Sequence, residues 1–102
     1  MKLLITVCLK DYEDDVYDIF NSSKIGVFST TDVTGFRNDH KSPMLEDWFA
    51  SGDERFDSLM LFSFTSDENA EKGMELVQKY NKDRNNEFPV RAFIVPVDKA
   101  SF

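Results

Sequence analysis

Hydrophobic and polar residues alternate with two different periods along this chain. A period of two predicts strands over residues 2–9, from 25 or 27 to 36, and over 56–65 and 88–97. A period of 3.6 predicts helices over residues 11–23 and from 66 to about 80. The predicted order is β-α-β-β-α-β, which is typical of a ferredoxin-like α+β fold with a four-stranded antiparallel sheet and two helices on one face.

Residue types at the helix ends refine these boundaries. Gly26 is expected to end the first helix, and Ser66 is a favourable N-cap for the second. A polar turn is expected over residues 81–87. The positions predicted to be buried are Tyr12, Val16, Ile19 and Phe20 in the first helix, and Ala70, Met74, Val77 and Tyr80 in the second.

The predicted strands are apolar on both faces, although two helices can cover only one face of the sheet. An antiparallel sheet with one face in water normally alternates cleanly between apolar and polar residues. A large exposed apolar patch usually marks an interface. We therefore expect an oligomer that buries the uncovered face; the alternative is that a few exposed apolar residues need no explanation. The residues assigned to that face are Leu4, Cys8, Leu59, Leu61 and part of 90–97.

A long segment without strand or helix periodicity follows the second strand, at about residues 37–54. Loops of more than about 12–15 residues are usually functional or disordered. Ser42-Pro43 is typical of a helix start, so we expect a short amphipathic helix here that docks a partner. The alternative is that its apolar side chains pack against the body or a neighbouring subunit. The expected docking residues are Met44, Leu45, Trp48 and Phe49.

Composition and charge narrow the possible functions. The chain has 102 residues, 41% of them hydrophobic, which predicts one folded domain over 1–102. A net charge of −7 argues against nucleic acid as a partner. The single cysteine, Cys8, excludes an internal disulfide framework and is expected to be a buried apolar side chain. The N-terminal apolar run of about seven residues is short for a signal sequence, and no stretch predicts membrane insertion, so the cytoplasm is the expected location.

Metal binding and catalysis find little support in the sequence. His40, with Asp39 and Glu46 nearby, is a weak candidate for a divalent metal site. Structural zinc usually takes four ligands rich in Cys and His, and that pattern is missing. A lone His without a positioned Ser or Cys does not make a catalytic triad, so we do not expect an enzyme.

Two short blocks resemble motifs of the PII signal-transduction proteins. Asp14-Asp15-Val16 resembles the family's Asp-Asp-Val, and Thr31-Asp32-Val33-Thr34-Gly35-Phe36 resembles its Thr-Glu-Val-Lys-Gly-Phe. The spacing between the blocks matches without a gap, and the similarity is best over residues 2–37. The long segment at about 37–54 then falls where the family carries its T-loop.

The resemblance implies a non-enzymatic regulator. PII-like proteins are homotrimers that bind small effectors in the clefts between subunits and dock a membrane transporter or an enzyme through the T-loop. The effector-binding residues expected from the resemblance are Ser29, Gly35, Phe36, Arg37, Lys82, Arg84 and Lys99.

The chain also departs from the family pattern. The family's Gly-rich segment before the fourth strand cradles nucleotide phosphates, whereas residues 81–89 contain no glycine. The paired basic residues after that strand are reduced to Lys99, and Arg37 comes one place early. Binding of ATP or ADP is therefore expected to be poor or absent, and the effector is unknown. The alternatives are a metal-responsive accessory protein, for instance of a metal-efflux system, and a ferredoxin-like enzyme of the dimeric small-oxygenase type, which the long loop and the lack of a second His disfavour.

Overall fold

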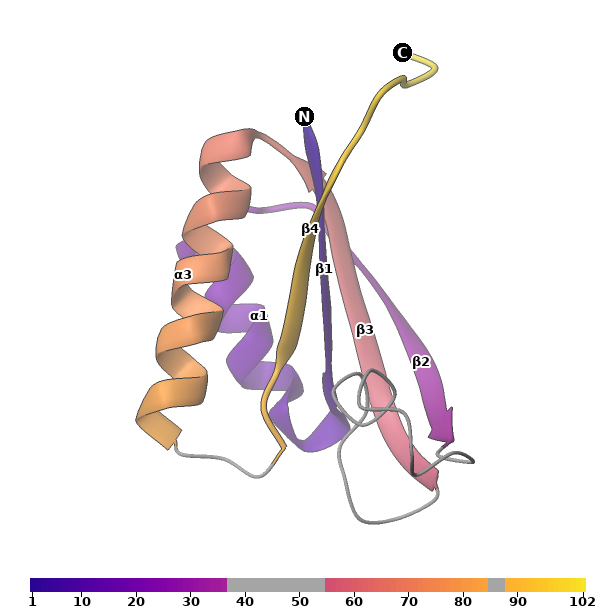
Figure 1. The fold of residues 1–102 in the computed structure, drawn as a ribbon, viewed down its shortest axis with the longest axis vertical. Helices are drawn as coiled ribbons and strands as arrows, with labels where there is room; N and C mark the ends of the chain where they lie inside the picture. Colours follow the sequence, from indigo (N-terminus) through magenta and orange to yellow (C-terminus); the bar gives the residue numbers. More distant parts are fainter. Residues whose placement is uncertain (37–54, 85–87) are drawn as a thin grey trace, which may run out of the picture.

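The computed structural model describes residues 1–36, 55–84 and 88–102, without the side chains of 55 and 56. All strand pairs are antiparallel, in the order β2-β3-β1-β4, and α1 and α3 lie on one face of the sheet (Figure 1). This arrangement confirms the predicted ferredoxin-like fold. The elements in order are β1 (Lys2–Leu9), the 3-10 turn η1 (Lys10–Tyr12), α1 (Glu13–Ser22), β2 (Ser29–Phe36), β3 (Arg55–Thr65), α3 (Asp67–Arg84) and β4 (Arg91–Pro96).

The turn after α1 is made by Lys24, so the prediction that Gly26 ends the helix is wrong. Lys24 has a φ of 63°. Its N–H donates to Asn21 O, and the N–H of Ile25 donates to Phe20 O at 2.9 Å. These two bonds form a Schellman motif, in which a left-handed residue follows the helix end. Lysine occupies a position where glycine is usual, and the buried Ile25 side chain joins Phe20 in the core.

The second helix is longer at its C-terminal end than the sequence predicts. α3 reaches Arg84, so most of the turn expected over 81–87 is helical. Its last two turns are supported by an ion pair of 3.4 Å between Lys79 and Asp83, and basic residues suit the negative end of the helix dipole. The predicted cap at its start is confirmed, because the N–H of Asn69 donates to Ser66 Oγ at 3.1 Å.

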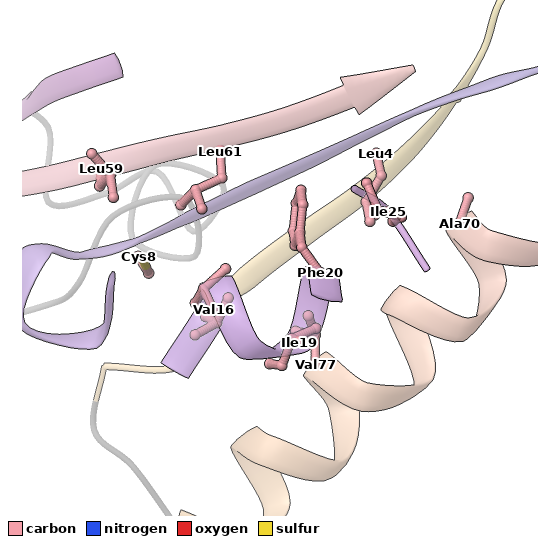
Figure 2. Packing of buried hydrophobic residues seen from close by; sticks show 11 residues of the cluster. Leu4, Cys8, Val16, Ile19, Phe20, Ile25, Leu59, Leu61, Ala70 and Val77 are labelled. Atoms are coloured by element: carbon pink, nitrogen blue, oxygen red, sulfur yellow. The ribbon is translucent and has the colours of Figure 1, made fainter. Parts of the chain in front are cut away.

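The helices cover the sheet face opposite to the one that the sequence analysis assigned to them. Leu4, Cys8, Leu59 and Leu61 are buried in the core beneath the helices, together with Val16, Ile19, Phe20 and Val77 (Figure 2). Their expected place on the uncovered face is therefore wrong. A period of two tells which residues share a face, but it cannot tell which of two apolar faces the helices cover.

The uncovered face is nevertheless apolar, as predicted. Leu3 lies opposite Phe64 and Val95, and Ile5 lies opposite Phe62 and Phe93. Residues directly opposite on paired strands share a face, so these six side chains form one group. We call it the uncovered apolar face. Phe64 is 57% exposed and Val95 40% exposed, which leaves much of this group in contact with solvent.

Candidate functional site

Three of the residues expected to bind an effector lie along β2. Ser29 begins the strand and is exposed. Gly35 and Phe36 end it; Gly35 is buried, and Phe36 is 56% exposed. Because Ser29 is paired with Phe62 and Phe36 with Arg55, they lie at opposite ends of this edge strand.

The expected basic residues lie on the other side of the fold. Lys82 and Arg84 are in the last turn of α3, beside the start of β4, whereas Lys99 is exposed in the segment after β4. β2 and β4 are the two edges of the sheet (Figure 1). Within one chain, the width of the sheet therefore separates the β2 residues from these three basic residues.

Arg84 is held in a cluster that the sequence analysis did not predict. Its guanidinium carbon lies 5.6 Å from the ring centre of Tyr12 and 5.2 Å from that of Tyr80. Its Nη1 is 3.8 Å from Asp15 Oδ2, and the Tyr80 hydroxyl donates to the same oxygen at 2.6 Å. We call these four residues the Tyr-Arg-Asp cluster. Burial, and then the hydrogen bond to Asp15, raises the pKa of Tyr80 well above its usual range.

This cluster links the first turn of α1 to the last turns of α3. The only sequence signal for it was the spacing of Tyr80 and Arg84, which lie one helical turn apart. Nothing local predicts their contact with Asp15, which is 65 residues away from Tyr80. Since Arg84 already has a carboxylate and two aromatic partners, Lys82 is the more available cation; among the described residues it forms no ion pair.

Several expected site residues lie outside the described part of the chain. They are Arg37, the docking residues Met44, Leu45, Trp48 and Phe49, and the metal candidates Asp39, His40 and Glu46. Within 1–36, 55–84 and 88–102, no three His, Cys, Asp or Glu side chains are grouped so that they could hold a metal ion. In the same ranges, no helix has the length and apolar composition needed to cross a membrane.

Cys8 lies on the helix-covered side of β1 and is 4% exposed. Burial, with a smaller contribution from the negative charge of Glu13, raises the pKa of its thiol to about 12. The thiolate is the reactive form of cysteine, so this residue is inert at neutral pH. Its predicted role as a buried apolar side chain is confirmed.

Comparison with known proteins identifies the fold. Neither a protein-family model nor a curated protein matches the sequence. Among solved structures, the chain is similar to a protein of Thermus thermophilus described as a PII-like signalling protein. The TM-score is 0.62 at 16% identity, over 91% of this chain and 82% of that one. The fold of this protein is therefore the PII-like form of the ferredoxin-like fold, as the two sequence blocks indicate.

Proposed function

We propose that this protein is a non-enzymatic regulator of the PII-like type. In this proposal it forms a homotrimer, binds a small effector in the clefts between subunits, and docks a membrane transporter or an enzyme through residues 37–54. The observation that carries the proposal is the similarity of its fold to a PII-like signalling protein over 91% of the chain. The two sequence blocks around Asp15 and Gly35 support it independently.

The uncovered apolar face supports the assembly. Phe64, Phe93 and Val95 are all more than a third exposed on this face. Packing it against the same face of other copies would remove these side chains from water, at about 25 cal/mol per Å² of apolar area. If the copies form a closed ring by joining the two different edges of their sheets, the β2 edge of one chain would adjoin the β4 edge of the next.

A ring of this kind would also bring the separated site residues together. Gly35 and Phe36 of one copy would lie beside the end of α3 in the next copy, where Lys82 is exposed. Ser29 and Lys99 would meet near the other end of the same cleft. Because Lys82 and Lys99 are cations, the effector that fits best is a small anion.

The molar mass in solution tests the assembly. Light scattering on a sizing column is expected to give three times the chain mass of 11.8 kDa. Phe64→Lys and Val95→Lys should weaken the trimer, because each would bury an unpaired charge in the interface. Gln78→Lys is the control, since Gln78 is exposed on α3, which lies on the other face of the sheet (Figure 1). A wild-type protein that stays monomeric at all concentrations would contradict the proposal.

Nucleotide binding is tested separately by calorimetry with ATP, ADP and AMP. We expect poor binding or none at millimolar concentrations, because residues 81–89 have no glycine that would let backbone N–H groups close around a phosphate. Micromolar affinity for any of the three would show that another part of the cleft binds phosphate. That result would contradict the expectation drawn from the missing glycines, but it would not contradict the proposed trimer.

The docking role of residues 37–54 can be followed through Trp48, the only tryptophan in the chain. If Trp48 is an anchor for a partner, its emission in the free protein should be red-shifted and readily quenched by acrylamide. Trp48→Ala should then leave the melting temperature nearly unchanged. Blue-shifted emission, with a loss of about 3–5 kcal/mol of stability in Trp48→Ala, would instead show a core aromatic residue and exclude docking through this side chain.

A further inference from the structure

A shallow groove lies between α1 and α3, on the outer side of the helix layer. Its volume is about 300 Å³. Its apolar surface comes from Ile19 on α1 and from Leu76 and Tyr80 on α3. The helices lie side by side (Figure 1), and they cover the face of the sheet that is opposite to the uncovered apolar face.

Carboxylates border this apolar surface on both helices. Asp15 and Asp18 contribute from α1, and Asp83 contributes from α3. Among the described residues of the lining, the only cation is Lys79, which is paired with Asp83 at 3.4 Å. Asp18 is exposed and has no ion pair or hydrogen bond in the described part of the chain. Arg84, outside the lining, is paired with Asp15, so the groove combines an apolar surface with a net negative charge, and Asp18 is the carboxylate that remains unpaired among the described residues.

The Tyr-Arg-Asp cluster keeps one end of the groove at a defined width. The hydrogen bond of 2.6 Å from Tyr80 to Asp15 joins the two helices directly, and Arg84 stacks against Tyr80 and lies 3.8 Å from the same carboxylate. A ligand would meet a groove that is already formed, so little of its binding free energy would be used to order the site.

We infer that the α1–α3 groove is a docking site for a cationic amphipathic helix of a partner protein. The apolar side chains of such a helix would contact Ile19, Leu76 and Tyr80, while its Lys and Arg side chains would pair with the bordering carboxylates. Helix-in-groove recognition uses this combination of apolar anchors and flanking charges. The negative rim disfavours anions and acidic partners, and the described residues lack the clustered ligands that a metal ion needs. This inference does not depend on the proposed effector site or on residues 37–54.

The inference can be tested with a designed peptide and the full-length protein. The probe is an acetylated peptide of Leu and Lys, about five helical turns long, with Leu at positions that share one helical face. A second peptide carries Glu in place of every Lys, and a third has the Leu and Lys order scrambled. In two-dimensional NMR titrations of 15N-labelled protein, the first peptide should shift the amide signals of α1 and of the second half of α3. The other two peptides should leave these signals unchanged.

Substitutions distinguish binding in the groove from a general attraction to the negative charge of the protein. Asp18→Lys should weaken binding of the Leu-Lys peptide about fivefold or more, because attraction is replaced by repulsion. Lys79→Glu should tighten it, since it removes the one cation among the described lining residues; a misfolded variant could not produce this gain. Glu71→Lys is the matched control, with the same change of charge on α3 outside the groove lining. Melting curves would show whether each variant is folded.

Three results would overturn the inference. The first is a lack of any shift with the Leu-Lys peptide up to millimolar concentration. The second is equal weakening by Glu71→Lys and Asp18→Lys, which would show that only net charge matters. The third is binding of the scrambled peptide with the same affinity and the same shifts, because the groove would then not distinguish an amphipathic helix from another peptide of the same composition.

Discussion

The side-chain amide of Asn81 is hydrogen-bonded in both directions to the backbone of Val90. Its Nδ2 donates to Val90 O at 2.9 Å, and its Oδ1 accepts from the Val90 N–H at 2.8 Å. Asn81 lies near the end of α3, and Val90, which is 2% exposed, directly precedes β4. The amide thus acts as a backbone partner would act in a sheet, and it attaches the start of β4 to the helix.

Asn81→Asp should destabilise the protein by about 1–3 kcal/mol, because the carboxylate can accept the Val90 N–H but cannot donate to Val90 O, which is left buried without a partner. Urea unfolding followed by circular dichroism measures this loss. Gln78→Asp is the control, because Gln78 is exposed on the same helix. Equal losses in the two variants would mean that added negative charge, and not the paired amide, explains the effect.

Gly73→Ala should destabilise the protein, although alanine normally stabilises a helix by about 1 kcal/mol relative to glycine. A Cβ at Gly73 would lie 2.8 Å from Leu4 Cδ2, and Leu4 is fully buried. Overpacking of this kind typically costs about 1–3 kcal/mol, so we expect a net loss measurable as a lower melting temperature. Gly26→Ala is the control, because no atom lies within 4 Å of its Cβ position. A higher melting temperature for Gly73→Ala would show that Leu4 moves aside without cost.

Stability should fall as the pH rises above about 9, because the thiol of Cys8 ionises more readily in the unfolded chain than in the folded protein. The pKa of this thiol is 9.0 without the fold and about 12 within it. Between these values the unfolded chain loses the proton while the folded protein keeps it. The contribution of this thiol to the free energy of unfolding is therefore fully present below pH 9 and is lost progressively above it. The expected loss from this thiol at pH 10 is about 1.4 kcal/mol.

The measurement for Cys8 is urea unfolding of the wild type and of Cys8→Ser at pH 8 and pH 10. Serine does not ionise in this range, so its variant should lose less stability between the two pH values, whatever its stability at pH 8. An equal loss in both proteins would contradict the predicted contribution. Ellman's reagent should also react with Cys8 only when the protein unfolds, because the thiol is buried.

Tyr80→Phe should destabilise the protein by about 1–2 kcal/mol, because it removes the hydrogen bond of 2.6 Å to the Asp15 carboxylate. Tyr17→Phe provides the control, since Tyr17 is a partly buried tyrosine whose ring packs against Phe28. Its hydroxyl forms no hydrogen bond within the described residues, so its removal should change stability by less than about 0.5 kcal/mol. Similar melting temperatures for Tyr80→Phe and the wild type would show that this bond contributes little.

Local patterns in the sequence were sufficient to predict the order of the elements and their approximate limits. The alternation over β1 and β3, the helical stripe through Val16 and Phe20, and the cap at Ser66 all depend on residues that are neighbours in the chain. The two blocks around Asp15 and Gly35 also indicated the PII-like form of the fold, and the similarity to a solved structure bears this out.

Packing over long sequence separations decided the features that the sequence could not predict. Both faces of the sheet are apolar, so only the docking of α1 and α3 determined that Leu4 and Leu61 are buried beneath helices while Leu3 and Phe64 are left uncovered. Lys24 adopts a left-handed conformation that its residue type disfavours, because the return of Ile25 to the core requires the turn there.

Packing between segments that are distant in the sequence also explains why the partners of the candidate site residues could not be predicted. The sequence analysis placed Arg84 in a polar turn and expected it to bind an effector, but the tertiary structure brings Tyr12 and Asp15 to it from the other helical segment. Residue type and local spacing determine which side chains are available to a site. The partners that each side chain acquires depend on which elements pack together, and this is a property of the whole fold.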